Sequence, residues 1–154
     1  MPLFIALSTE VVEAYRLGGP DAHGNMPERH ISDGDGNPCR HCLTDIPKGK
    51  SMLVLAHKPF HGTHPYAEVG PIFLCAELCP KGGDTVLPQI LTTSPDFLLK
   101  GYNSSDRIVY GTGVITPYAD ITAQAQTIFE NPEVTYIHVR SARNNCYQVR
   151  IDRG

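Results

Sequence analysis

Four of the five cysteines occur in two close pairs, and paired thiols can bind a metal ion. The first pair is Cys39 and Cys42, in the segment Asn37-Pro38-Cys39-Arg40-His41-Cys42-Leu43. The second pair is Cys75 and Cys79, further along the chain. Two thiols separated by two residues in a Gly- and Pro-rich turn form a common half-site for a tetrahedral thiophilic metal. The pattern predicts a zinc site with all four cysteines as candidate ligands.

The second pair can share a metal with the first only if the chain bends between Cys75 and Cys79. In an extended strand four residues span roughly 13 Å, whereas each sulfur must lie about 2.3 Å from the zinc. Residues 76–78 would have to form a helical turn. The alternative that stays open is that Cys75 is a buried core thiol and the first pair binds no metal, because small buried cysteines are common.

Two other chemistries are disfavoured in this part of the chain. The C-x-x-C motif of dithiol catalysts opens a helix that lowers the thiol pKa, but residues 44–49 predict a turn that leads to a strand. A histidine cluster of His57, His61 and His64 could suggest a metal, yet Pro59 prevents the helix that would align these side chains. We interpret the three histidines as solvated loop residues.

The last two predicted strands, 134–141 and 146–152, form a hairpin. Tyr147 is expected on its apolar face. One register brings the apolar residues together, with Val139 opposite Val149 and Ile137 opposite Ile151. This register leaves a three-residue loop that ends at Asn145, which should take the left-handed conformation.

The opposite face of this hairpin is polar, and we interpret it as a solvated surface, with one wall of a cleft as the alternative. Cys146 and His138 share this face, but the register separates them by roughly 13 Å, too far for a nucleophile and its base, which need about 3 Å. In a cleft, arginines could donate to a carboxylate or phosphate. With the polar loop 58–71 as the facing wall, the candidate ligand-binding residues are Tyr66, Glu68, Arg140, Arg143 and Asn145.

The remaining patterns predict an α+β fold with a largely antiparallel mixed sheet, two main helices and long Gly/Pro-rich loops, in a single domain over residues 1–154. There is no steady alternation of strands and helices. The long loops are 18–38 and 58–71. Helices are expected over 9–17 and 120–130. Strands are expected over 3–7, 51–57, 72–78, 97–102 and 107–116, with a weaker one over 85–91.

Composition limits the partners. The chain of 154 residues has a formal net charge of −3, which argues against nucleic acid, because phosphate-backbone binding needs a basic face. No signal peptide is expected at Met1–Leu7, and no apolar run reaches membrane-spanning length. We expect a cytoplasmic protein with reduced thiols, no membrane association, and a small anion or a protein as partner.

The chain resembles a bacterial domain-of-unknown-function family numbered 1203. Four segments carry the resemblance, in the same order as in the family, and they span essentially the whole chain: Asn37–Leu43, Met52–Ala56, Pro65–Leu74 and His138–Tyr147. One departure is Cys75, where relatives often carry histidine; either residue can bind zinc. The resemblance implies no activity, cofactor or catalytic residue.

Two functions from different classes follow. The first is a non-catalytic binding module with a structural zinc site. The second is an enzyme that acts on a small anionic substrate in a polar pocket between the 58–71 loop and the C-terminal hairpin. We favour the first, because the only specific pattern in the sequence is the structural one.

Overall fold

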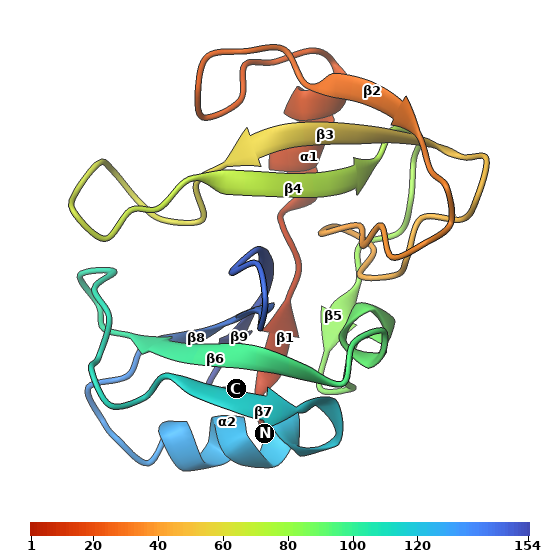
Figure 1. Ribbon diagram of the computed structural model, residues 1–154. Helices are drawn as coiled ribbons and strands as arrows, with labels where there is room; N and C mark the ends of the chain where they lie inside the picture. Colours follow the sequence, from red (N-terminus) through yellow and green to blue (C-terminus); the bar gives the residue numbers. More distant parts are fainter.

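The computed structural model describes all residues, 1–154, and shows two β-sheets stacked as separate layers (Figure 1). The larger sheet has six strands in the order β5-β1-β9-β8-β6-β7, and every paired strand in it is antiparallel. Its strands are β1 (Leu3–Ile5), β5 (Gly83–Asp84), β6 (Asp96–Tyr102), β7 (Val114–Pro117), β8 (Tyr136–Ser141) and β9 (Tyr147–Asp152). The α+β class with antiparallel sheets is thereby confirmed.

The smaller sheet is also antiparallel, with strands β2 (Glu28–Ile31), β3 (Ser51–His57) and β4 (Gly70–Cys75) in that order. Helix α1 (Thr9–Arg16) lies against it and connects it to β1 of the larger sheet (Figure 1). The helix begins where the Ser8 hydroxyl accepts a hydrogen bond from the Val11 N–H. Val12 packs into the same core as β3 and β4.

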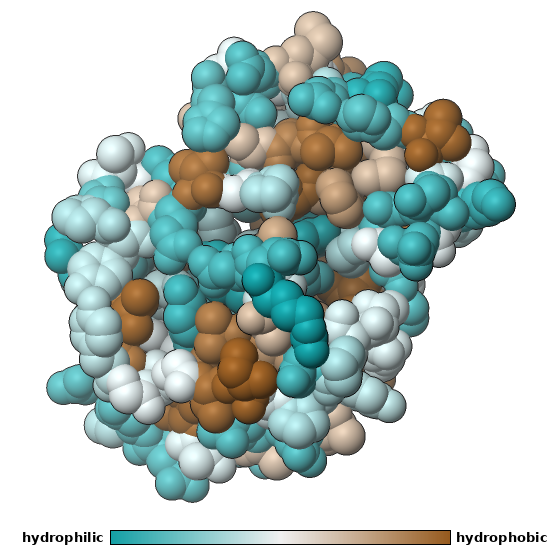
Figure 2. Space-filling model, in the orientation of Figure 1, coloured by the Kyte–Doolittle hydropathy of each residue, from teal (hydrophilic) through white to brown (hydrophobic).

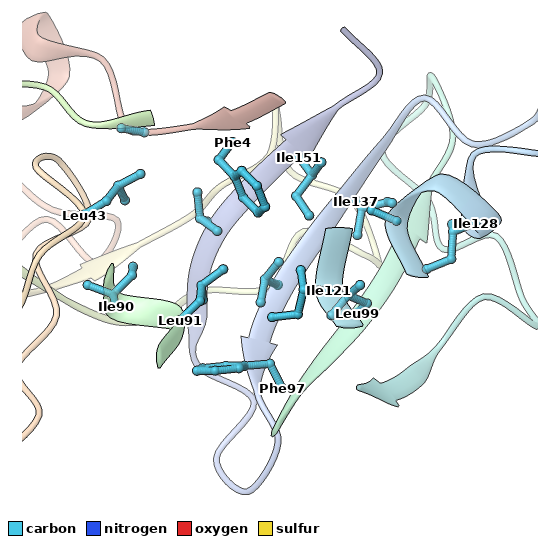
Figure 3. Packing of buried hydrophobic residues seen from close by; sticks show 14 of the residues in the cluster. Phe4, Leu43, Ile90, Leu91, Phe97, Leu99, Ile121, Ile128, Ile137 and Ile151 are labelled. Atoms are coloured by element: carbon cyan, nitrogen blue, oxygen red, sulfur yellow. The ribbon is translucent and has the colours of Figure 1, made fainter. Parts of the chain in front are cut away.

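A separate core lies on the face of the larger sheet that points away from the smaller sheet. Helix α2 (Ile121–Ile128) covers the strands there (Figure 3). The residues of α2 that face the sheet, Ile121, Ala125 and Ile128, are buried. Leu43 comes from the cysteine-bearing loop and packs into this core beside Ile90, where Figure 3 shows the two side chains together. The loop with the first cysteine pair therefore reaches the core of the larger sheet.

Four element predictions were wrong or incomplete. Of the strand expected over 107–116, only residues 114–116 belong to a strand, β7 (Val114–Pro117). The weak strand over 85–91 is instead a bend at Thr85 and Val86, followed by the 3-10 helix η1 (Gln89–Thr92). Pro88, directly before η1, cannot donate a ladder hydrogen bond. The expected loop 18–38 contains β2, whose four residues are all exposed and so show no apolar pattern. The strand expected over 72–78 is β4, which begins at Gly70 and ends at Cys75.

The register of the last hairpin is confirmed in part. Ile137 opposes Ile151 and Val139 opposes Val149, and Asn145 is left-handed with φ of 58°. A bulge then shifts the pairing, so that Arg140 opposes Tyr147 and the expected pairing of Ala142 with Cys146 is lost. Tyr147 consequently leaves the apolar face predicted for it and joins the core of the smaller sheet.

The polar face of this hairpin is buried between the two layers, and our interpretation of it as a solvated surface was wrong. His138 is 1% exposed and Arg140 3% exposed. The His138 ring lies 4.7 Å from that of Tyr102 and 4.8 Å from that of Tyr147, measured between centroids. His57, expected to be a solvated loop residue, is the buried last residue of β3. We call this region the polar layer.

Burial keeps the two histidines of the polar layer uncharged. Burial lowers the pKa of His57 to about 4, helped by the nearby Arg40 cation. The pKa of His138 lies well below its ordinary value because of burial and then the Arg140 cation. Both groups bind protons more weakly in the folded than in the unfolded protein, so the stability they confer is complete above about pH 6.5 and is lost as the pH falls toward 4.

We therefore expect the free energy of unfolding to decrease between pH 7 and pH 4, with about 3 kcal/mol of the decrease due to His57. Denaturant unfolding at several pH values measures it. His57→Gln should show a shallower pH dependence than the parent protein, whereas the exposed His23→Gln should match the parent. Equal slopes for His57→Gln and the parent would contradict the buried neutral imidazole.

Candidate metal centre and polar cavity

The first cysteine pair is shaped by a tight turn. The Cys39 N–H donates to the Thr44 carbonyl at 3.0 Å, and the Leu43 N–H donates to the Cys39 carbonyl at 3.0 Å. Leu43 is left-handed with φ of 59°, which is uncommon for a branched residue. Its side chain is buried in the core of the larger sheet, and this burial holds the turn in place. The turn directs both thiols toward the second pair.

The second pair is brought in by the end of β4. Cys39 forms a parallel bridge with Phe73 of β4, so the turn lies directly beside that strand. The strand ends at Cys75, and the chain bends at Ala76 and Glu77 before Cys79. A helical turn over residues 76–78 was expected here, but a bend without helix is sufficient to bring both sulfurs to one place.

The four sulfurs form a compact group, all lying within 4.8 Å of one another. The Cys39 and Cys79 sulfurs are 4.0 Å apart, and those of Cys42 and Cys75 are 3.9 Å apart. A tetrahedral zinc site with Zn–S distances of about 2.3 Å has sulfur–sulfur edges of about 3.8 Å. The cluster can therefore hold a metal ion with little movement.

Several groups donate hydrogen bonds to these sulfurs. The Cys75 N–H donates to the Cys39 sulfur at 3.3 Å, as backbone amides do to metal-bound thiolates. An Arg16 N–H donates to the Cys79 sulfur at 3.2 Å. The His41 Nδ1 lies 3.1 Å from the same sulfur, while its Nε2 lies 2.8 Å from the Thr9 hydroxyl. The Cys39 and Cys79 sulfurs thus have partners that suit the negatively charged form.

Electrostatics oppose four thiolates in one place without a cation. Burial and the Cys39 and Cys42 sulfurs raise the pKa of the Cys79 thiol to about 11. Hydrogen bonds to Cys39 and Cys42 likewise raise the pKa of the Cys75 thiol, whereas hydrogen bonds from Cys39 and Cys75 lower that of Cys42. The cluster alone therefore keeps protons on some sulfurs, and a bound divalent cation would replace them.

Cys79, His41 and Thr9 could also be read as a thiol nucleophile, a base and an orienting group. The position of the thiol argues against that reading, because the Cys79 sulfur belongs to a cluster of four. Burial, followed by the Arg16 cation, lowers the pKa of His41, so the ring is neutral and can donate from only one nitrogen. A proton on Nδ1, directed at the sulfur, with Nε2 accepting from Thr9, is the arrangement that orients a metal-bound thiolate.

The turn is also attached to the larger sheet by the buried Arg40. Its Nε donates to the Tyr147 carbonyl of β9 at 2.8 Å, and its Nη1 donates to the Pro38 carbonyl at 2.7 Å. Burial lowers the pKa of Arg40 to about 10, which still leaves the guanidinium charged at neutral pH. This contact connects the first cysteine pair to the polar layer.

A small cavity of about 170 Å³ lies between the two layers, and Figure 2 shows the molecule hollowed between them. Three of the candidate ligand-binding residues meet there. Glu68 accepts a hydrogen bond from the Asn145 side chain at 3.1 Å and lies 3.8 Å from Arg140. Lys100 of β6 adds a second cation, 3.5 Å from the Glu68 carboxylate.

The other two candidates lie elsewhere. The Tyr66 hydroxyl is hydrogen-bonded to that of Tyr110 at 2.8 Å. The exposed Arg143 side chain forms an ion pair with Asp96 at 3.0 Å. Neither lines the cavity around Glu68.

Sequence reasoning missed the groups that surround both sites. Arg16 and His41 contact the Cys79 sulfur. Lys100 lies beside the Glu68 carboxylate, and His57 lines the cavity. His41 lies between Cys39 and Cys42, so its sequence position was a usable signal. Arg16 and Lys100 come from distant elements, and nothing in their local sequence marks them.

Comparison with known proteins adds a family and no relative of known activity. The family model described as "Protein of unknown function (DUF1203)" matches residues 36–153, which include all four clustered cysteines as well as Glu68 and Arg140. No curated protein and no solved structure matches the chain. None of the helices is both long and apolar enough to cross a membrane.

The close approach of the chain at Gly82 provides a test of the turn. A Cβ at this position would lie 2.4 Å from the Cys42 carbonyl oxygen, and the Gly82 N–H donates to the His41 carbonyl at 2.8 Å. We expect Gly82→Ala to lower the free energy of unfolding by about 1–3 kcal/mol, because the backbone of the turn must move. Thermal or denaturant unfolding measures it.

Gly113→Ala is the matched control, since a Cβ there meets only the Lys100 side chain at 4.0 Å. It should leave stability nearly unchanged. Equal unfolding curves for the two alanine variants would argue against the tight packing at Gly82.

Proposed function

Because the chain belongs to the DUF1203 family, whose function is unknown, we propose a function from its own geometry: a non-catalytic binding module stabilised by a structural zinc ion. The observation that carries this proposal is the convergence of four sulfurs from two separate segments within 4.8 Å. Zinc bound by Cys39, Cys42, Cys75 and Cys79 would link the turn, β4 and the bend that follows it. The ion would supply neutralising charge and fixed geometry there.

The ligand set favours zinc over other metals. Four thiolates at tetrahedral spacing are typical of zinc or of iron with sulfur, whereas calcium and magnesium prefer oxygen ligands. Zinc would be redox-inactive at this site, as suits a structural role. All five cysteines are free thiols, so a reducing compartment would keep the site available, and we propose the bacterial cytoplasm.

A closed site of four protein ligands supports the non-catalytic role. Catalytic zinc sites keep an open position for water or substrate, whereas four cysteines fill a tetrahedron. The hydrogen bonds around the cavity also do not pair a nucleophile with a base. Cys146 donates weakly to the Asn144 carbonyl at 3.8 Å, and the His57 Nδ1 lies 3.1 Å from the Tyr15 hydroxyl.

An enzyme acting on a small anionic substrate is the second candidate. It is favoured by one observation: Glu68, Arg140 and Asn145 meet at a cavity between the 58–71 loop and the C-terminal hairpin. In such an enzyme Arg140 would hold the anion and Glu68 would act as acid or base. Turnover of a small anion by the zinc-loaded protein would favour this second candidate.

Metal analysis tests the proposed zinc site. We expect about one zinc per chain in protein purified from zinc-containing medium, with no visible absorption of the kind that iron–sulfur sites give. Cys39→Ser should lose the metal and lower the free energy of unfolding by several kcal/mol, because structural zinc contributes directly to folding.

Cys146→Ser is the matched control, since this fifth cysteine lies outside the cluster. It should keep the metal and the stability of the parent protein. Parent protein without metal, together with an unchanged unfolding curve for Cys39→Ser, would disprove the site.

A further inference from the structure

Arg140 is a buried cation with unused hydrogen-bonding capacity. Its side chain is 4% exposed. Nη1 donates to the Asn145 carbonyl at 3.1 Å, and Nη2 donates to His138 Nδ1 at 3.1 Å, because a guanidinium has no acceptor. Nε is buried and has no partner. A buried donor without a partner is costly, and a charged one more so, so this group favours an anion.

The carboxylate nearest to Arg140 is that of Glu68, and it is held loosely. Its distance to Arg140 is 3.8 Å, longer than the usual charge-assisted hydrogen bond, and its distance to Lys100 is 3.5 Å. The Glu68 side chain is 42% exposed and comes from a loop. One half-exposed carboxylate thus faces two largely buried cations, which leaves a positive excess at the cavity.

The cavity beside Arg140 suits a ligand of a few atoms. Its volume of about 170 Å³ is below the range of roughly 300–1,000 Å³ typical of drug-sized ligands. Two further donors are available at its edge: the Asn145 amide, which already donates to Glu68, and the neutral His57 ring, which can offer one N–H. Val69 and Pro71 provide an apolar side.

We propose that this cavity binds a small oxyanion, and that the Glu68 carboxylate is an internal competitor that occupies the same donors in the free protein. A carboxylate is the favoured ligand, because the group already placed against Arg140, Lys100 and Asn145 is a carboxylate. The bound anion would displace Glu68 into solvent and receive the Arg140 donors more directly. This inference rests on the proposed binding role and names its ligand class.

Titration of the zinc-loaded full chain with sodium acetate and with sodium phosphate, at constant ionic strength, tests the inference. Amide shifts of Gly70 and Asn145 in ¹H–¹⁵N NMR spectra report binding at the cavity. We expect Glu68→Gln to bind acetate about tenfold more tightly than the parent, since the competing charge is removed, which corresponds to about 1.4 kcal/mol. Stronger binding of phosphate than of acetate would support the oxyanion site and overturn only the carboxylate preference.

Two further variants complete the design. Arg140→Gln should abolish acetate binding. If that variant does not fold, Lys100→Gln, whose side chain is 14% exposed, should weaken binding several-fold. Glu130→Gln, an acidic residue outside the cavity, and Arg143→Gln, which pairs with Asp96, are the charge-matched controls and should bind as the parent does.

The inference is overturned if Glu68→Gln binds acetate no more tightly than the parent, or if a folded Arg140→Gln still binds it. Zinc content, measured on the same samples, separates this failure from that of the metal site. Protein with a full complement of zinc and no anion binding would overturn only the ligand assignment, whereas absence of zinc from the parent would overturn the proposed module.

Discussion

The structure depends on the convergence of four sulfurs between a turn and the end of a strand. Cys39 packs in the core of the smaller sheet, while Leu43, four residues later, packs in the core of the larger sheet. The turn that carries the first cysteine pair therefore belongs to both layers. Because the second pair follows β4 directly, joining the two pairs fixes the position of the smaller sheet relative to this turn. A single coordination site can hold a long irregular segment that has little regular structure of its own.

The contact between the two layers is polar and aromatic, whereas the core of each layer is apolar. Arg40 donates from the cysteine turn to the β9 carbonyl of Tyr147, and His138 is surrounded by aromatic rings and Arg140. Burial of these groups favours the structure only while their hydrogen bonds are made, because a buried polar group without a partner costs free energy. Directional hydrogen bonds therefore set the alignment of the two sheets. A buried polar group that lacks a partner, such as Arg140 Nε, marks a place where a ligand could supply the missing hydrogen bond.

Local sequence was sufficient for elements whose own pattern decides their structure. The apolar run of β3, the Ser8 cap of α1 and the pairing of Val139 with Val149 all follow from residues near in sequence. The four cysteines were identified as a set because two closely spaced pairs of thiols are typical of metal ligands. The bulge that moves Tyr147 to the core of the smaller sheet could not be predicted, since it depends on packing between the sheets. For the same reason the polar face of the C-terminal hairpin, rich in His and Arg, was predicted to be exposed to solvent, although the smaller sheet covers it.

Apolar packing within one sheet and polar contacts between the two sheets have different consequences for local stability. Apolar burial against α2 is internal to the larger sheet and does not require the smaller one. The polar layer, by contrast, lies between the two sheets, and its buried histidines respond to protons. Protonation of these histidines should therefore loosen the contact between the two sheets before it unfolds the larger one, since regions joined by few apolar contacts open at lower free energy.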